Sequence, residues 1–177
     1  LSDNNPLEQL EELIKAISLS EINAVFTMSN ADNEGRLINK RLKLFAESSA
    51  NKYIFIDSMG SKNYLSALKY CACVVGNSSS GIIEAPSFGK PTVNIGVRQG
   101  GRAQSQSVIN CSANAKYILD AIMLSQSAEF IKLCHKIKNV YWSLNFLIEE
   151  GFNTFWIIRF FLLIIWFVLI LMFLILI

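Results

Sequence analysis

The sequence lacks most of the signals that mark a catalytic or metal-binding chain. It has one histidine and four cysteines in 177 residues, and no two cysteines have the Cys-x-x-Cys spacing of a zinc site. It contains no nucleophile elbow, no Walker lysine and no paired carboxylates at the site described below. The single histidine, His135, follows the last expected strand and is interpreted as a surface residue. We therefore expect no metal site, no cofactor and no catalytic residue in this chain.

The chain also has little excess of charge of either sign. Sixteen basic and 14 acidic residues give a formal net charge of +2, which offers no basis for nucleic-acid binding through bulk charge. With 52% hydrophobic residues the chain is not intrinsically disordered. Cys71 and Cys73 are too close for an easy disulfide, so the four cysteines are expected as reduced, buried thiols of a cytosolic protein.

The end of the chain is almost free of polar residues. From residue 152 to residue 177 only Asn153, Thr154 and Arg159 are not apolar. As a helix, this stretch would extend about 39 Å, against roughly 30 Å for the bilayer core. Three interpretations stay open: a frameshifted or truncated gene product, a membrane anchor through residues 155–177, and a hydrophobic helix that packs on a partner.

The first 138 residues alternate between strand and helix patterns. Strands are expected at residues 22–28, 53–56, 73–75 and 91–95, and helices at 7–17, 37–45, 61–70, 82–88, 113–124 and 127–138. Pro86 is expected to interrupt the helix over 82–88. This order predicts an α/β fold, a Rossmann-like parallel sheet with right-handed crossovers and flanking helices. The expected organisation is a domain over 1–138, a linker over 139–151 and a hydrophobic helical tail over 152–177. The first residue is not Met and no leader pattern follows, which we interpret as a start inside a longer chain.

The strongest local motif is the segment 74–84, Val-Val-Gly-Asn-Ser-Ser-Ser-Gly-Ile-Ile-Glu. An apolar strand ends, a small polar loop follows and a helix begins, so Ser78 and Ser79 stand where backbone N–H groups and hydroxyls could hold a phosphate. Glu84 is expected just inside that helix, about one turn beyond Ser80, where its carboxylate could accept two ribose hydroxyls. The alternative is an ordinary capped turn in which Glu84 only favours the helix dipole.

Two further loops follow strands at the same expected edge of the sheet. Arg98 and Arg102 lie in Gly-Val-Arg-Gln-Gly-Gly-Arg, and their planar donor forks suit a diphosphate. Asn30 and Asp32 follow the first strand, with Arg36 shortly after them. For both loops, a solvated surface turn is the alternative interpretation.

At these residues the chain resembles the C-terminal domain of the hydrolysing UDP-N-acetylglucosamine 2-epimerases, in particular the bacterial sialic-acid branch. The most specific stretch is GNSSSGIIEAPSFGKPTVNIGVRQGGR, residues 76–102. SNADNEGR at 29–36 and MGSKNYLSALKY at 59–70 agree in order and spacing. The likeness runs from about residue 1 to residue 138.

The resemblance implies one half of a GT-B-like architecture that binds UDP-N-acetylglucosamine or a related UDP-sugar. By likeness, Ser78 and Ser79 would hold phosphate, Glu84 the ribose hydroxyls and Arg98 the UDP part. The backbone of Ser58, Met59 and Gly60 would run alongside the uracil. Asn30, Asp32 and Arg36 form a second set. They match a region that touches a feedback inhibitor, CMP-sialic acid, in animal relatives, so the resemblance implies a regulatory or substrate-proximal role for them.

The implied reaction converts UDP-N-acetylglucosamine to N-acetylmannosamine and UDP, by elimination of UDP and addition of water. The family's acids and bases lie outside the matched region, so this chain alone is expected to be inactive. The resemblance also implies a cytoplasmic location and leaves a homo-oligomer open. Two other functions stay open: the nucleotide-binding domain of a GT-B glycosyltransferase, and a membrane-tethered, non-catalytic module that binds nucleotide sugars.

Overall fold

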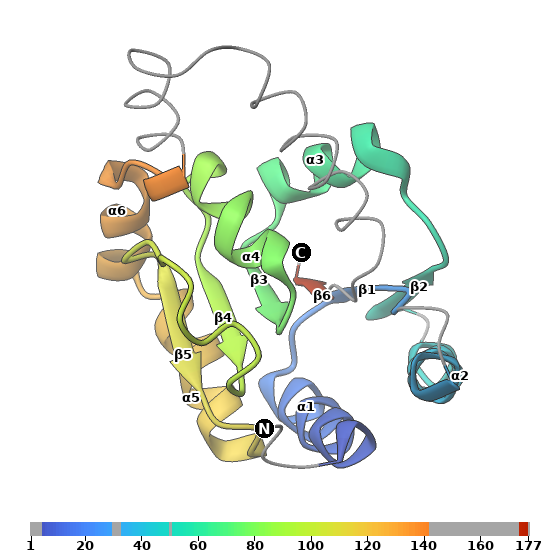
Figure 1. Ribbon diagram of the computed structural model, residues 1–177. Helices are drawn as coiled ribbons and strands as arrows, with labels where there is room; N and C mark the ends of the chain where they lie inside the picture. Colours follow the sequence, from blue (N-terminus) through green and yellow to red (C-terminus); the bar gives the residue numbers. More distant parts are fainter. Residues whose placement is uncertain (1–4, 30–32, 50, 142–173, 177) are drawn as a thin grey trace.

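A single sheet organises the computed structural model, which describes residues 5–29, 33–49, 51–141 and 174–176 (Figure 1). Within that part of the chain the sheet has six strands in the order β2-β1-β6-β3-β4-β5. The strands are β1 (Ala24–Thr27), β2 (Tyr53–Ile56), β3 (Cys73–Gly76), β4 (Thr92–Ile95), β5 (Val108–Cys111) and β6 (Leu174–Leu176). The expected Rossmann-like α/β fold is confirmed.

The first five strands all run in one direction. β1 pairs with β2, β3 with β4 and β4 with β5, each in parallel register. β6 lies between β1 and β3 and is antiparallel to both, so β1 and β3 are parallel to each other. The carboxyl ends of β1 to β5 therefore meet at one edge of the sheet.

β6 corrects part of the prediction for the hydrophobic tail. Residues 174–176 form a strand where a helix was expected; residues 152–173 and 177 lie outside the described residues. A short apolar run has no periodicity that separates helix from buried strand, and here β1 and β3 offer backbone partners on both sides. Within the described residues no helix combines the length and apolar character that crossing a bilayer requires.

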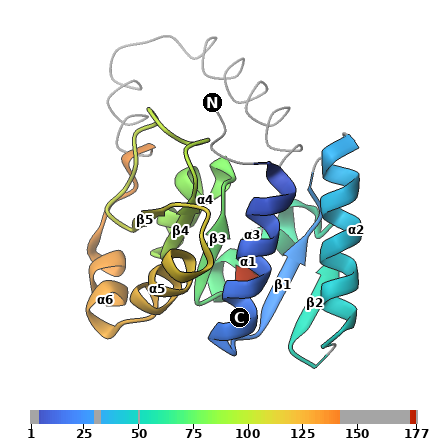
Figure 2. The same ribbon diagram turned by 90° about the horizontal axis from the view of Figure 1, so that it is seen from below.

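Helices cover both faces of the sheet (Figure 2). One face carries α1, α2 and α5, where α1 contacts both of the other helices, and the other face carries α3, α4 and η1. Their bounds are α1 (Pro6–Ser20), α2 (Asn33–Glu47), α3 (Gly60–Tyr70), α4 (Ser79–Ile83), the 3-10 helix η1 (Ala85–Phe88), α5 (Ala115–Ser125) and α6 (Ala128–Lys136). β5 was not predicted; it forms the edge of the sheet beside β4.

α1 shows how local sequence and packing agree. The Asn5 side chain accepts a hydrogen bond from the backbone N–H of Leu7 at 3.0 Å, and Pro6 stands at the first helical position. The helix ends where Glu21 adopts a left-handed conformation, φ 55°. The expected apolar side of the helix is buried, as Leu10, Leu13, Ile14 and Ile17 join the main core.

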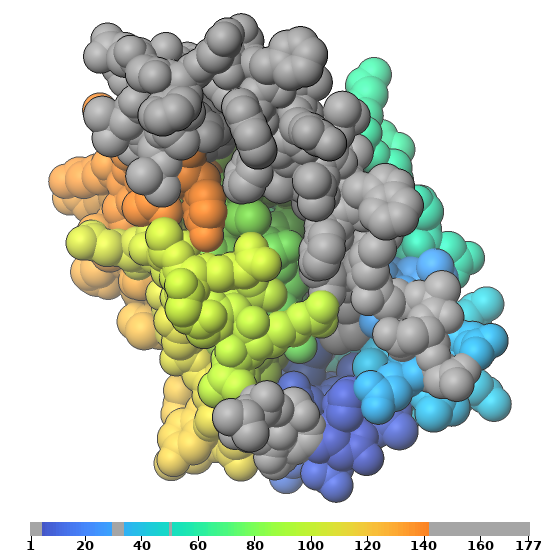
Figure 3. All heavy atoms as spheres, viewed as in Figure 1, coloured from blue at the N-terminus to red at the C-terminus, as the bar shows by residue number. Residues whose placement is uncertain are grey.

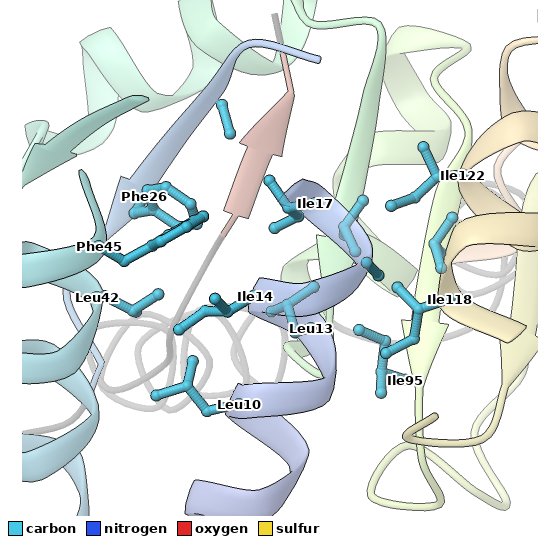
Figure 4. Close-up of a cluster of buried hydrophobic side chains, with 14 of the residues drawn as sticks. Leu10, Leu13, Ile14, Ile17, Phe26, Leu42, Phe45, Ile95, Ile118 and Ile122 are labelled. Atoms are coloured by element: carbon cyan, nitrogen blue, oxygen red, sulfur yellow. The ribbon is translucent and has the colours of Figure 1, made fainter. Parts of the chain in front are cut away.

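Alternate residues of β1 and of β3 belong to two separate cores. Phe26 points into the main core with residues of α1, α2 and α5 (Figure 4), whereas its neighbour Val25 joins the second core with Leu68 of α3. In β3, Val75 belongs to the main core and Val74 to the second. β1 and β3 are therefore buried on both faces, as expected for central strands of a parallel sheet covered on two sides.

Replacement of Phe26 by alanine should destabilise the fold strongly. Phe26 is 1% exposed and makes edge-to-face contacts with the rings of Phe45, at 5.8 Å, and Tyr53, at 6.0 Å. We expect Phe26→Ala to lower the free energy of unfolding by about 3–5 kcal/mol, measured by urea denaturation. Leu44→Ala, at a 54% exposed position of α2, is the control and should change it by less than about 1 kcal/mol. Equal losses in both variants would contradict this account of the core.

Candidate functional site

The loops that carry the predicted ligand residues follow β2, β3 and β4 at the carboxyl edge. They are residues 57–60, residues 77–80, here called the serine loop, and residues 96–102, here called the arginine loop. The parallel registers of β1 to β5 bring these loops to one edge, as the sequence predicted. Asn30 and Asp32 lie outside the described residues, and Arg36 lies exposed near the start of α2.

The serine loop is buried and tightly held. Ser78, Ser79 and Ser80 are 4%, 8% and 4% exposed. Ser78 is the N-cap of α4, and its hydroxyl accepts a hydrogen bond from the backbone N–H of Ser80 at 3.4 Å. This hydrogen bond and the burial of the three serines restrict the positions of their hydroxyl groups.

Gly81 allows α4 to approach β4 closely. A β-carbon at this position would lie 2.8 Å from Cγ2 of Thr92, and the Thr92 hydroxyl donates a hydrogen bond to the Gly81 carbonyl at 2.8 Å. Only a residue without a side chain permits this contact, which anchors the helix directly behind the serine loop.

Glu84 lies at the junction of α4 and η1. The predicted interruption of the helix over 82–88 is confirmed, but it falls at Glu84 and not at Pro86: α4 ends at Ile83 and η1 begins at Ala85, so Glu84 does not lie inside the helix. Pro86 has no N–H to continue an α-helical ladder, which explains the break. The expected spacing is confirmed, since the Ser80 hydroxyl donates a hydrogen bond to the Glu84 carboxylate. Burial raises the pKa of Glu84, and the bond from Ser80 acts in the opposite direction.

Tyr64 of α3 contacts the same group and was not predicted as a site residue. Its hydroxyl lies 2.5 Å from Oγ of Ser80. Burial raises the pKa of Tyr64 well above its ordinary value, so the phenol stays neutral at working pH. The sequence shows Tyr64 only as part of the apolar side of a helix. The available signal was that a buried tyrosine hydroxyl needs a hydrogen-bond partner.

Gln99 joins the arginine loop to the serine loop. It is 2% exposed, and its Nε2 donates a hydrogen bond to the carbonyl of Asn77 at 2.7 Å. Arg98 and Arg102, on either side of it, are exposed, and Figure 3 shows this segment, in yellow-green, at the surface of the molecule. A buried amide thus fixes the backbone from which the two arginines extend. Gln99 was not predicted, because only the two arginines of this loop suggested a ligand in the sequence.

Residues 58–60 form the turn between β2 and α3. The hydroxyl of Ser58 accepts a hydrogen bond from the N–H of Gly60 at 3.4 Å, and Met59 packs against the second core. Gly60 has φ +63°, a left-handed conformation that favours glycine. The turn is therefore held from below by Met59, while Ser58 and Gly60 remain exposed.

Asn39 was also missed, and it supports the end of β1. Its Oδ1 accepts a hydrogen bond from the N–H of Ser29 at 2.7 Å, and its Nδ2 donates to the Ser29 carbonyl at 3.2 Å. This amide of α2 replaces a strand neighbour at the point where the chain leaves the sheet. Its position on the polar side of a helix carries no sequence signal for this role.

Asn139 and Tyr141 fasten the chain beyond α6 to the site. Asn139 Nδ2 donates hydrogen bonds at 2.6 Å to the carbonyl of Ile83 and to the hydroxyl of Ser87. The hydroxyl of Tyr141 donates to the carbonyl of Ala103 at 2.9 Å. The expected linker over 139–151 stays a prediction; the contacts show that its first residues bind the domain.

The cysteines and the histidine stay away from this chemistry. All four cysteines are free, Cys71, Cys73 and Cys134 are buried, and burial raises the pKa of Cys73 to about 12. A thiol so hard to ionise is a poor nucleophile. His135 is exposed, as expected. Among the described residues no group of three or more His, Cys, Asp or Glu side chains is placed to hold a metal ion.

The comparisons with known proteins agree on one family. The family described as UDP-N-acetylglucosamine 2-epimerase matches residues 1–145. The chain is 36% identical over 151 residues to "Polysialic acid biosynthesis protein P7" of Escherichia coli, covering 84% of this chain and 38% of that protein. It is 38% identical over 115 residues to a "GDP/UDP-N,N'-diacetylbacillosamine 2-epimerase (hydrolyzing)" of Campylobacter jejuni, covering 64% and 30%.

A solved structure supports the fold. The UDP-GlcNAc 2-epimerase of Methanocaldococcus jannaschii, in complex with UDP-GlcNAc and UDP, superposes with a TM-score of 0.58 at 16% identity, covering 78% of this chain and 37% of that one. The chain thus spans between 30% and 38% of the length of these relatives.

The burial of Glu84 generates a stability prediction. Because the pKa of Glu84 is raised in the folded state, the folded chain holds its proton more tightly than the unfolded chain does. The associated stability is complete below the ordinary carboxyl pKa and is lost as pH rises through the folded-state value. Glu84→Gln removes the charge, so the variant should gain stability over the parent as pH rises from 4 to 8, measured by thermal melts.

The control for this measurement is Glu47→Gln, at an exposed carboxylate of α2. It should show no comparable growth of the difference with pH. A Glu84→Gln variant that is less stable than the parent at pH 8, or whose difference does not change with pH, would contradict the assignment of a desolvated carboxylate.

Proposed function

The chain belongs to the UDP-N-acetylglucosamine 2-epimerase family, and on that premise we propose that it is the UDP-binding half of a hydrolysing epimerase. The whole enzyme would convert UDP-N-acetylglucosamine or a related UDP-sugar to the free 2-epimeric sugar and UDP. The chain spans about a third of the relatives' length, which is consistent with one half of a two-domain enzyme.

One observation carries the proposal: a hydrogen bond from the buried Gln99 side chain joins the arginine loop to the serine loop. Gln99 Nε2 donates to the Asn77 carbonyl at 2.7 Å, one residue before Ser78 and one residue after Arg98. Hydroxyls, loop backbone and two guanidinium groups therefore belong to one structural unit. Such a set favours a dianionic or trianionic ligand over a neutral one.

Each predicted residue has a role in this proposal. Ser78 and Ser79 hold the diphosphate, and Arg98 reaches it from the opposite loop. Glu84 accepts the ribose hydroxyls, for which its carboxylate has acceptor sites beyond the one that Ser80 uses. The turn at Ser58, Met59 and Gly60 borders the uracil. Asn30, Asp32 and Arg36 stay predictions for a regulatory or substrate-proximal role.

The contribution of this half to the reaction is stabilisation of the leaving group. When the bond between the sugar C1 and the diphosphate oxygen breaks, negative charge develops on UDP. Arg98 and the donors of the serine loop are arranged to stabilise that charge. Removal of the proton at C2 and the addition of water need acids and bases that we assign to the other half of the enzyme.

The names of two relatives bear on which sugar the UDP carries. The name of the Escherichia coli relative favours sialic-acid synthesis, and that of the Campylobacter jejuni relative favours a diacetamido sugar. Family membership favours an epimerase over a GT-B glycosyltransferase, and a cytoplasmic enzyme over a membrane-tethered module.

Calorimetric titration of the 177-residue chain with UDP tests the binding site. Glu84→Ala and Arg98→Ala each remove a charge-assisted contact and should weaken UDP binding by roughly tenfold to 100-fold. His135→Ala, at an exposed residue of α6, is the control and should bind UDP as the parent does. Equal UDP affinity in the parent, Glu84→Ala and Arg98→Ala would refute the proposed site.

A separate assay tests the proposal that this chain alone does not catalyse the reaction. The purified chain should bind UDP and yet release no N-acetylmannosamine or UDP from UDP-N-acetylglucosamine in a coupled assay. Turnover by this chain alone would show that its own residues supply the acid and base.

A further inference from the structure

A chain of hydroxyl groups leads from the second core to Glu84. The Tyr64 hydroxyl lies 2.5 Å from Oγ of Ser80, and Oγ of Ser80 is bonded to Oε2 of Glu84. Because an ionised carboxylate only accepts, the single Ser80 proton points to Glu84. Ser80 must then accept the proton of Tyr64. The direction of both hydrogen bonds is thus Tyr64 to Ser80 to Glu84.

Each member of this chain has little freedom to move. Ser80 is 4% exposed in the first turn of α4, and Tyr64 packs against the second core, which includes Leu68 and Cys71. Ser80 and Glu84 are four residues apart, and the Glu84 N–H also bonds to the Ser80 carbonyl at 2.8 Å. The carboxylate is therefore held by a rigid support that reaches back to α3.

We infer that Tyr64 and Ser80 are positioning residues that hold the Glu84 carboxylate ready for the ribose, and that this arrangement makes the site selective for nucleotides with free 2′- and 3′-hydroxyls. The inference rests on the proposed function, because it requires Glu84 to meet the ribose of UDP. Tyr64 and Ser80 act through Glu84 and need not touch the ligand.

The physical basis is the cost of orienting a carboxylate at the moment of binding. Glu84 without its support could rotate about its side-chain bonds, and two vicinal hydroxyls bind well only to a carboxylate in one orientation. Ser80 uses one acceptor site on Oε2, which leaves Oε1 for the ligand. The hydrogen bond from Ser80 thus restrains the carboxylate and leaves acceptor sites for the ribose hydroxyls.

A structural role for Tyr64 predicts different behaviour. If its hydroxyl only holds α3 against α4, its loss disturbs the whole site and weakens every ligand alike. If it acts through Glu84, its loss weakens only ligands that have ribose hydroxyls. A comparison of UDP with 2′,3′-dideoxyuridine diphosphate separates the two roles.

The experiment measures dissociation constants of both nucleotides for the 177-residue chain and its variants. Tyr64→Phe keeps the ring and removes the hydroxyl; Ser80→Ala breaks the next link. Each should weaken UDP by roughly threefold to tenfold, the range of one lost hydrogen bond, and change the dideoxy analogue by less than about twofold. In a Glu84→Ala background, Tyr64→Phe should have no further effect on UDP.

The matched control is Tyr70→Phe, which removes a hydroxyl from the same helix at a 75% exposed position. It should leave both dissociation constants unchanged. Circular dichroism melts identify a variant that fails to fold, and Ser80→Ala then carries the test in place of Tyr64→Phe.

The outcomes distinguish the inference from the proposed function. If the parent prefers UDP to the dideoxy analogue and Glu84→Ala abolishes that preference while Tyr64→Phe and Ser80→Ala do not, the proposed function stands and the inference is overturned. Equal weakening of both nucleotides by Tyr64→Phe also overturns it. If the parent binds no UDP, the proposed function fails and the inference fails with it.

Discussion

The parallel direction of β1 to β5 is the constraint on which the rest of the site depends. The loops after β2, β3 and β4 are up to 45 positions apart in the sequence, and they meet only because their strands end at the same edge. At the centre of the sheet, alternate residues of β1 and β3 are buried in two cores on opposite faces. A strand of reversed direction would carry its loop to the other end of the sheet. β6, which is antiparallel, contributes no candidate ligand residue.

Short polar contacts then turn neighbouring loops into one unit. Thr92 holds α4 through the Gly81 carbonyl, Gln99 holds the serine loop through the Asn77 carbonyl, and Ser80 holds Glu84. These groups are largely withdrawn from water, where a hydrogen bond is strong and an unpaired group is costly. Glu84 shows the cost: burial disfavours its charged form, which is the form that a ribose hydroxyl would bind. Stability and ligand binding therefore make opposite demands on one residue.

Much of the fold was predictable because its signals are local. The apolar periodicity of α1 and the alternation of strands with helices identify the Rossmann-like sheet, and the glycine and serine pattern at 76–81 identifies the turn after β3. β5 was missed, as its four residues have no distinctive pattern and pair only with β4. The tail was read as a helix, although residues 174–176 pair with two strands far away in the sequence.

The supporting residues of the site were not predictable for the same reason. The supporting contacts join residues that are 10 to 22 positions apart in the sequence, and they involve Tyr64, Gln99 and Asn39. The sequence next to each of these residues does not indicate its hydrogen-bond partner. Ser78, Glu84 and Arg98 were predicted, because each belongs to a loop whose composition already suggests an anion or a sugar. The sequence thus predicted candidate ligand groups, and the structure showed which neighbouring groups hold their loops.

The central claim is that UDP binds at the carboxyl edge, between the serine loop and the arginine loop. Hydrogen–deuterium exchange of the 177-residue chain with and without UDP tests it most directly, because it reports where the ligand protects the backbone. The account predicts slower exchange in peptides that cover residues 76–88 and 96–107, and no change in α1 or at Asn51 and Lys52, which precede β2 at the opposite edge. Protection confined to other segments, or no protection at saturating UDP, would contradict it.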